Sequence, residues 1–293
     1  MASKGQVISQ PGQQYGVEKA QYDQQGMQMN PYPVVVQPGM APQGGMMMQQ
    51  PQGMIMQQPQ GMMMQAPPNV MIPAGLPPGL AYLAGLSEVK VHQILELAEV
   101  LIGWERNNKY DICNSQGQKF MFAKEDTDCC TRQFCGVSRP FQMNITDNMG
   151  QPLMALDRPF RCQGSLCWCC CLQEMEIQSP PGVVQGTVKE IWTCWTPKYQ
   201  VFNAQNQVVF TIVGECCYCK CCTDVIFHVY EGDGDGGQEI CSIVKHWGGC
   251  REVFGGANDF TINFPADMDL MRKMLLFGAT FLIDFNYFEY NRN

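Results

Sequence analysis

The sequence has few of the side chains on which most enzymes depend. Histidine occurs three times in 293 residues, and His92, His228 and His246 are scattered without an obvious triad. Neither a G-x-S-x-G nucleophile elbow nor a G-x-x-x-x-G-K-[ST] phosphate-binding loop is present. We therefore expect a protein that is not an enzyme.

Basic charge is also scarce. The chain has 19 lysines and arginines against 27 acidic residues, for a net charge of −8. Nucleic-acid binding needs a lysine and arginine surface, so we expect no nucleic-acid partner. An acidic protein is also repelled on average by anionic lipid, so any membrane attachment must come from apolar or covalent anchors.

The N-terminal sequence MASKGQVISQ has no apolar core and no signal cleavage site. The 17 cysteines are therefore not expected to form a disulfide scaffold of the secreted type. Five of them cluster at Cys162, Cys167, Cys169, Cys170 and Cys171. In a cytosolic chain, such a cluster is more often a lipidation or metal site than a set of bridges.

Residues 1–78 differ in composition from the rest. They hold 12 of the 19 prolines, 13 of the 21 methionines and an eight-residue repeat such as GMMMQQPQ. This density of Pro and Gly predicts a disordered Pro/Met/Gln-rich arm. We interpret it as a flexible tail for protein partners. Binding of Cu(I) by thioethers and a proline-motif ligand remain alternatives, although the arm has no P-x-x-P spacing.

Residues 79–293 predict one mainly β domain. Short apolar segments surround turn sequences at 115–118, 147–150 and 203–207, and two more flank the Gly-rich loop that follows Tyr230. Many short strands separated by turn signals favour an antiparallel sandwich or barrel. The segment 86–102 fits a helix and a strand about equally.

An apolar segment near the C-terminus predicts one helix at about 268–288, capped by Asp267 or Asp269. Between Lys273 and Glu289 the helix is about 22 Å long, short of the roughly 30 Å of hydrocarbon in a bilayer. We favour a helix that fills a β-barrel; a membrane span remains the alternative, in which Asp284 must face protein, water or another subunit. The residues concerned are Leu275, Phe277, Phe281, Asp284 and Phe285.

Several segments of residues 79–293 resemble the calcium-responsive phospholipid scramblase family. The resemblance implies a Tubby-like fold, a closed 12-stranded antiparallel barrel around a hydrophobic C-terminal helix. It also implies calcium-dependent, ATP-independent, bidirectional movement of phospholipids between leaflets. The matching segments are GWERNNKYDICNSQGQ, EDTDCCTR, SRPFQMNITDNMGQ, CWCCCLQEMEIQSPPG, KHW and FLIDFNYFE.

The resemblance places S-palmitoylation on Cys167, Cys169, Cys170 and Cys171. Several acyl chains give stable anchoring where one chain gives only marginal binding. Buried structural thiols are one alternative. Zinc is another, because cysteines between 216 and 222 have the C-x-x-C spacing of thiolate sites.

The family's calcium segment corresponds to residues 256–267, with Asn258, Asp259 and Asp267 as the candidate ligands. A loop of this kind offers oxygen ligands at odd positions and a carboxylate at the twelfth. The alternation of Phe260, Ile262 and Phe264 fits a barrel strand equally well. A second acidic loop, at 231–236, begins like a calcium loop but is interpreted as a solvated hairpin turn, because its twelfth position is a serine.

The sequence therefore predicts a palmitoylated phospholipid scramblase on the cytoplasmic face of the plasma membrane. Membrane phospholipids and calcium are its expected partners, and a homo-oligomer is compatible with the sequence. Lys245 has no cationic neighbour, which argues against nuclear import through the KHW segment. The rival interpretation is a lipid-anchored, Tubby-like interaction protein without scrambling activity.

Overall fold

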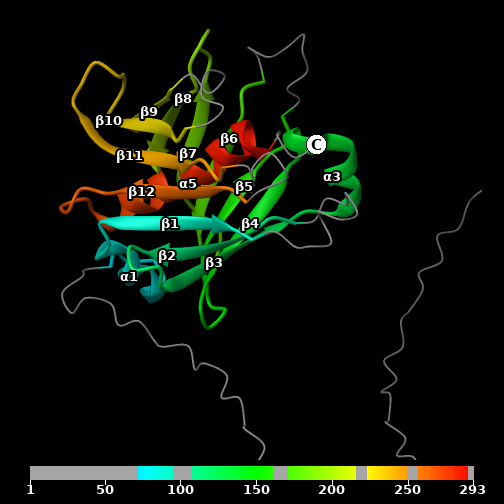
Figure 1. Cartoon of the computed structure of the whole chain (residues 1–293). Coiled ribbons are helices and arrows are strands. Elements are labelled where there is room, and N and C mark those ends of the chain that lie inside the picture. Colours follow the sequence, from blue (N-terminus) through cyan, green and yellow to red (C-terminus); the bar gives the residue numbers. More distant parts are fainter. Residues whose placement is uncertain (1–71, 95–106, 162–170, 216–222, 250–256, 290–293) are drawn as a thin grey trace, which may run out of the picture. The chain divides into compact units, whose positions relative to one another are not determined.

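The computed structural model describes residues 72–94, 107–161, 171–215, 223–249 and 257–289. Strands dominate these residues, and one long helix follows them (Figure 1). The strands are β1 (Glu88–Gln93), β2 (Lys109–Asn114), β3 (Lys119–Asp126), β4 (Phe141–Asp147), β5 (Pro152–Arg158), β6 (Glu174–Ser179), β7 (Val183–Ile191), β8 (Lys198–Asn203), β9 (Val208–Gly214), β10 (Val225–Glu231), β11 (Glu239–His246) and β12 (Asp259–Asn263). The helical elements are η1 (Pro78–Leu80), α1 (Ala81–Ala84), α3 (Cys129–Cys135), η2 (Gly136–Ser138) and α5 (Leu270–Tyr287).

The 12 strands form one closed barrel in which each strand pairs antiparallel with its neighbours in sequence. Closure comes from β1 pairing with β12, with Val89 opposite Ile262. A closed barrel leaves no strand edge open to another chain. The mainly β fold class, with its closed 12-stranded barrel around a C-terminal helix, is confirmed.

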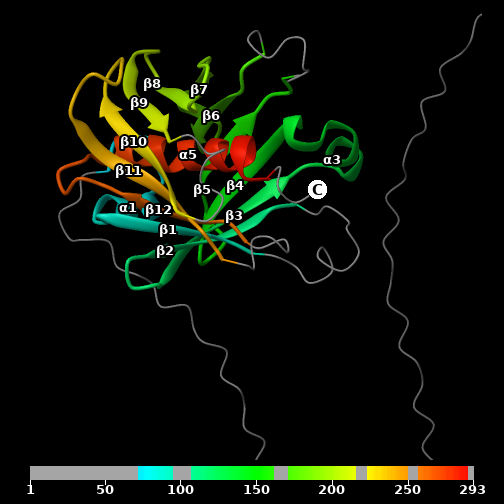
Figure 2. The same ribbon diagram turned by 45° about the horizontal axis from the view of Figure 1, so that its top comes forward.

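Antiparallel order gives the barrel two different ends. The odd-numbered strands all finish at one end, where residues 94–108, 127–140, 159–173, 192–197, 215–224 and 247–258 connect them to the next strands. We call this the long-connection end. The even-numbered strands finish at the opposite, tight-turn end, where 115–118, 148–151 and 204–207 are short hairpin turns. α3 lies at the end of the barrel where α5 finishes (Figure 2).

Three hairpins at the tight-turn end share one local design. Asn114, Asp147 and Asn203 each accept two backbone N–H groups, two and four residues further on, at 2.8–3.0 Å. The residue three positions after each has a positive φ and is Gly117, Gly150 or Asn206. Glycine and asparagine adopt this conformation at little cost, which fixes the register of the flanking strands. These hairpins were predicted from the sequence.

α5 fills the barrel (Figure 2). Asp269 caps its first turn by accepting the N–H of Arg272 at 3.0 Å, as predicted. Its residues from Lys273 to Phe285 are all buried, because the barrel surrounds the helix on every side. The interpretation as a core helix is therefore confirmed. The alternative of a membrane span is not: none of the helices in the described residues is both long and apolar enough to cross a bilayer.

Two other predictions concern segments of which the structure describes only a part. The ambiguous segment 86–102 forms strand β1 over its described portion, and 95–106 lie outside the described residues. The N-terminal arm, assigned to residues 1–78, lies outside them up to residue 71. Leu76 packs into the hydrophobic core just before η1. The division of the chain at residue 78 stays a prediction.

Candidate functional site

The last turn of α5 and the two residues that follow it contact many parts of the barrel. From Asp284 to Glu289, each successive side chain contacts a different part of the barrel wall. Asp284 accepts a hydrogen bond from Tyr110 on β2, and Phe285 stacks on Phe141 of β4. Asn286 is hydrogen-bonded to Arg158 of β5 and Tyr199 of β8, and Tyr287 donates to Glu190 of β7. Phe288 packs edge-on to Phe227 and Phe260, and Glu289 forms an ion pair with Arg139. The segment FLIDFNYFE therefore seals the barrel at the long-connection end.

The buried polar groups around this segment form what we call the polar cap. Its members are Asn108, Tyr110, Glu125, Arg139, Arg158, Gln173, Glu190, Asn258, Asp284 and Glu289. They come from segments as far apart in the chain as Asn108 and Glu289, and the closed strand order brings them together. Buried polar groups are costly unless they find partners, and the cap members are hydrogen-bonded to one another, although Glu289 Oε2 is buried without a hydrogen bond.

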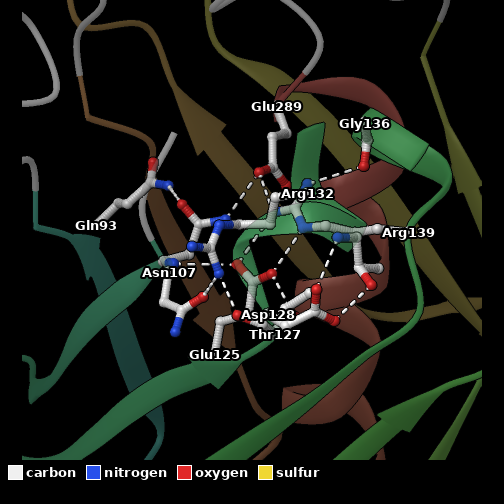
Figure 3. A network of polar contacts seen from close by, with 11 residues as sticks. Gln93, Asn107, Glu125, Thr127, Asp128, Arg132, Gly136, Arg139 and Glu289 are labelled. Carbon is white, nitrogen blue, oxygen red and sulfur yellow. Dashed lines mark hydrogen bonds and ion pairs between the residues drawn. The ribbon is translucent and has the colours of Figure 1, made fainter. Parts of the chain in front are cut away.

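Arg139 is the central cation of the polar cap (Figure 3). Its Nε and one terminal nitrogen donate to both oxygens of Glu125, at 2.6 and 3.0 Å. The same nitrogen donates to Glu289 Oε1 at 2.5 Å, and the other terminal nitrogen donates to the Gly136 carbonyl at 3.1 Å. This forked geometry is the strong form of an arginine–carboxylate pair. Arg139 thereby ties the wall strand β3 to Glu289, the second residue after α5.

Burial and charge act on the pKa values of this cluster in opposite directions. Burial alone raises the pKa of Glu125, but the hydrogen bonds and charge of Arg139 outweigh it and hold that pKa below the ordinary value. For Glu289, burial wins and raises the pKa, with Arg139 offsetting part of the effect. The two carboxylates together keep the pKa of Arg139 above its ordinary value despite burial. The two carboxylates thus favour the charged form of Arg139.

Asp284 is held inside the barrel by two donors. Tyr110 donates its hydroxyl to Oδ2 at 2.7 Å, and Asn258 donates its amide to Oδ1 at 2.6 Å. Asn258 is itself fixed by its backbone N–H, which donates to Gln93 at 3.0 Å. The acidic residue within the apolar helix therefore faces protein, which is one of the three environments named for it in the sequence analysis.

Arg158 forms the second basic centre of the polar cap. It donates to Gln173 Oε1 through two nitrogens, at 3.1 and 2.8 Å, and to Asn286 at 3.2 Å. Burial lowers the pKa of Arg158 to about 10. Burial also raises the pKa of Glu190, which accepts the Gln173 N–H at 3.0 Å and the Tyr287 hydroxyl at 3.3 Å.

The predicted lipidation cysteines fall mostly on residues that are not described. Cys167, Cys169 and Cys170 lie outside the described residues, as do the zinc candidates between 216 and 222. Cys171 is described, is partly exposed and carries a free thiol just before β6. The strands that flank residues 162–170 are β5 and β6, and both adjoin that segment at the long-connection end. Palmitoylation remains a prediction.

The structure does not bring the three predicted calcium ligands together. Asn258 turns inward to Asp284, whereas Asp259 turns outward and accepts a hydrogen bond from His92 Nδ1 at 2.8 Å. Asp267 is exposed in the turn that precedes α5. Phe260 and Ile262 are buried, so the segment is strand β12 with an apolar inner face. In the described part of the chain, no three acidic, histidine or cysteine side chains are placed to hold one metal ion.

The acidic loop between β10 and β11 is a hairpin whose carboxylates have separate protein partners. Asp233 accepts from Gln200 at 2.6 Å, Asp235 pairs with Lys198 at 3.4 Å, and Glu231 pairs with Arg272. These partners lie on β8 and α5, so the carboxylates point in different directions. This arrangement favours the interpretation as a hairpin turn.

One group of side chains imitates a hydrolytic triad. His246 Nδ1 lies 2.9 Å from Asp224 Oδ2, and its Nε2 lies 2.8 Å from the hydroxyl of Thr261. However, β12 is paired with β1 and β11 on both sides, so its amides are committed to the ladder. A nucleophile without oxyanion donors gains little transition-state stabilisation. Neighbouring Lys245 is buried over the ring of Phe288 and adds no surface charge.

Sequence analysis missed most of the polar cap. The signal was present, because Glu125 continues the inward alternation of Met121 and Ala123 in β3, and Arg139 lies in SRPF just before a strand. Both lie in segments that carry the family resemblance, yet neither was identified as a pairing partner of Glu289. Only the three-dimensional closure of the barrel brings residues 150 positions apart into one ion pair.

Comparisons with known proteins agree on one family. The family model described as Scramblase matches residues 66–290. The chain is 49% identical to phospholipid scramblase 1 of Mus musculus over 222 residues, which cover 75% of this chain and 67% of that protein. It is 49% identical to phospholipid scramblase 2 of Bos taurus over 221 residues, 75% of this chain and 74% of that protein. With phospholipid scramblase 1 of Homo sapiens, identity is 50% over 221 residues, 74% of this chain and 68% of the other. No solved structure matches the chain significantly.

Proposed function

The chain belongs to the scramblase family, and from that premise we propose that it moves phospholipids between the two leaflets of a membrane. The observation that carries the proposal is the family match over residues 66–290, which takes in the whole barrel and α5. We propose bidirectional movement that needs no ATP. The absence of a P-loop from the sequence supports this part of the proposal.

The barrel limits where lipid can move. α5 fills its interior from Lys273 to Phe285, and the polar cap seals one end. A phospholipid headgroup has no room beside the helix, because protein interiors are close-packed. Lipid movement is therefore assigned to the surface that the domain presents to the bilayer, rather than to the inside of the barrel.

Attachment to the membrane is proposed to be covalent. Acyl chains on Cys167, Cys169, Cys170 and Cys171 supply more than the two anchors that stable binding needs. The cytoplasmic face of the plasma membrane is the proposed location. Cleaving thioesters with hydroxylamine should then release the protein from isolated membranes; full retention would count against acyl anchoring.

We also propose that this movement depends on calcium. The residues proposed from the sequence, Asn258, Asp259 and Asp267, do not form one ligand set, and Asn258 already bonds Asp284. Asp267 is the exposed member, and it stands beside the start of α5. We therefore propose Asp267 as the residue of this segment that meets calcium, with ligands from outside this set.

The test is leaflet exchange of a fluorescent phospholipid in liposomes that hold the purified full chain, without ATP and with or without calcium. Exchange that needs calcium and is weakened in Asp267→Asn would support the whole proposal. Asp235→Asn is the matched control, because Asp235 is also an exposed carboxylate but belongs to the β10–β11 hairpin. Truncation at Asp267 is not usable, because it removes the helix that fills the core.

A second function keeps the same anchor without lipid movement. In it, the protein recruits partners through residues 1–78 from the membrane surface. The composition of that segment favours it, because methionine side chains adapt to many partner surfaces. Absence of lipid exchange at every calcium concentration, with the protein verifiably bound to the liposomes, would establish this alternative over scrambling.

A further inference from the structure

Five aromatic side chains of the described residues are exposed, and all five lie at the long-connection end. They are Phe134 in the β3–β4 connection, Phe160 in β5–β6, Trp192 and Trp195 in β7–β8, and Trp247 in β11–β12. Phe134 is 89% exposed and Trp195 is 83% exposed. The exposed large apolar residues at the tight-turn end are aliphatic: Met149, Val183 and Val184. We call the first group the aromatic end.

Hydrogen bonds order the connections that carry several of these rings. Arg132 of α3 donates to Asn107 and to the Thr127 carbonyl, which fixes the helix against the barrel with Phe134 on its outer side. In the β7–β8 connection, the Thr193 hydroxyl donates to the Thr196 carbonyl, which closes a turn around Trp195. The N–H of Trp247 donates to Asp224 at 2.9 Å. Aromatic rings held in water by ordered loops indicate a surface that is covered by something else.

Free thiols lie in the same connections. Cys129, Cys130 and Cys135 belong to α3, Cys171 precedes β6, and Cys194 stands between Trp192 and Trp195. Under the proposed function, the β5–β6 connection also carries the acyl anchors. Acyl chains entering a bilayer from this connection would bring the neighbouring connections to the same interface, because all of them leave the barrel at one end.

We propose that the aromatic end is the surface on which the domain docks onto a lipid bilayer, with the axis of α5 pointing its C-terminal end at the membrane. Tryptophan is enriched at membrane interfaces because its ring is apolar and its N–H is polar. Exposed carboxylates at Asp126, Asp128 and Asp224 border the surface. The partner is therefore a bilayer with zwitterionic, phosphatidylcholine-like headgroups, which the aromatic side chains enter by apolar contact. Anionic headgroups do not strengthen this contact. This inference rests on the proposed function for its choice of a membrane.

The tryptophans themselves supply the measurement. The full chain is produced in bacteria, which leaves its thiols unacylated, and is mixed with vesicles of phosphatidylcholine brominated in its acyl chains. Docking is expected to quench tryptophan emission and shift it to shorter wavelength. Quenching should persist at about 0.5 M salt, because apolar contact is not screened. Adding phosphatidylserine to the vesicles should not increase it.

A pair of matched variants locates the surface. Phe134→Ser combined with Trp195→Ser should lower the vesicle partition coefficient by about tenfold or more, because both rings leave the interface. Met149→Ser combined with Val183→Ser removes exposed apolar side chains from the opposite end and should change it by less than about twofold. All four positions are exposed, so folding is kept, and urea unfolding checks that it is.

Three results would overturn the inference. One is an equal loss of binding in both double variants, and another is quenching that vanishes with salt. The third is an absence of quenching. If the native chain also self-associates and the double variant Phe134→Ser, Trp195→Ser is monomeric, the surface joins copies of the chain instead of docking on lipid. Docking without any leaflet exchange would leave this surface standing and refute the proposed scrambling instead.

Discussion

The two ends of the barrel use different chemistry to finish the same strands. At the tight-turn end, Asn114, Asp147 and Asn203 close hairpins with bonds between residues four apart at most. At the long-connection end, Arg139, Glu125 and Glu289 join segments far apart in the chain. The structure of the tight-turn end is specified by residues close together in sequence, whereas that of the long-connection end forms only after the barrel has closed. Local bonds can be lost one at a time, whereas loss of one member of a buried ion cluster leaves the others unpaired.

The strongest way to test this contrast is Arg139→Met. This change leaves the buried carboxylates of Glu125 and Glu289 without their cation, and it should lower the free energy of unfolding by about 3–5 kcal/mol. Urea unfolding followed by circular dichroism measures it. Arg272→Met is the control at the tight-turn end, where the Arg272–Glu231 pair is partly exposed, and it should cost no more than about 1 kcal/mol. Equal costs would break the contrast.

The buried hydrogen bonds at the two ends of α5 should give the next largest effect on the free energy of unfolding. Asp284→Leu removes both acceptors from Tyr110 and Asn258, and we expect a loss of about 2–4 kcal/mol. Lys273→Met removes the donor to the carbonyls of Ala84 and Leu86, each at 2.7 Å, at the other end of the helix. We expect this second change to cost about 1–3 kcal/mol. A larger loss for Lys273→Met than for Asp284→Leu would place the main fastening at the tight-turn end.

The pH dependence separates two carboxylates of the polar cap. The folded-state pKa of Glu125 is lowered, so its contribution to stability is present above the ordinary value of about 4.3 and is lost as the pH falls below it. The deficit of Glu125→Gln should therefore shrink as the pH falls. The pKa of Glu190 is raised, so its ionised form costs stability as the pH rises through that value.

Glu190→Gln consequently has the opposite profile. The free energy of unfolding of Glu190→Gln, minus that of the native protein, should be largest near neutral pH. This difference should diminish toward a pH of about 4.3. Urea midpoints of Glu190→Gln between neutral pH and about 4.3, and of Glu125→Gln below about 4.3, measure the two slopes. Slopes of the same sign in the two variants would contradict the assigned pKa directions.

The smallest effect is expected in the hairpins. Asn203→Ala removes an oxygen that accepts two backbone N–H groups, at 3.0 and 2.9 Å in an exposed turn. Water replaces part of these bonds, so the cost should be about 1 kcal/mol. Asp147→Ala should behave alike, because its bonds have the same pattern. A loss in either hairpin as large as that of Arg139→Met would remove the difference between the two ends.

Sequence reasoning succeeded where the physics is local. The hairpin turns, the cap at Asp269 and the length of α5 were predictable, because each depends on residues a few positions apart. The pairing of Arg139 with Glu289 was not, since it spans 150 positions and depends on barrel closure. The calcium assignment shows the same limit. Asn258 and Asp259 are adjacent in sequence, but strand geometry turns them to opposite faces.

Much of the family resemblance near the C-terminus reflects structure. Six successive positions from Asp284 have partners in the wall, so the pattern FLIDFNYFE is explained by sealing the barrel. The exposed aromatic residues, by contrast, have no such role in the described fold. Sequence patterns alone do not separate these two classes of residue, because both occur beside apolar strands.

The position of α5 at the end of the chain has a consequence for biosynthesis. The wall strands are made first, and the segment that occupies their interior is made last. The pairing of β1 with β12 likewise joins the first strand to the last. Until both steps occur, the inward apolar faces of twelve strands remain uncovered on the nascent chain, and such surfaces aggregate readily. Chaperone supply during translation, rather than the stability of the finished barrel, should then limit how much of the protein a cell accumulates.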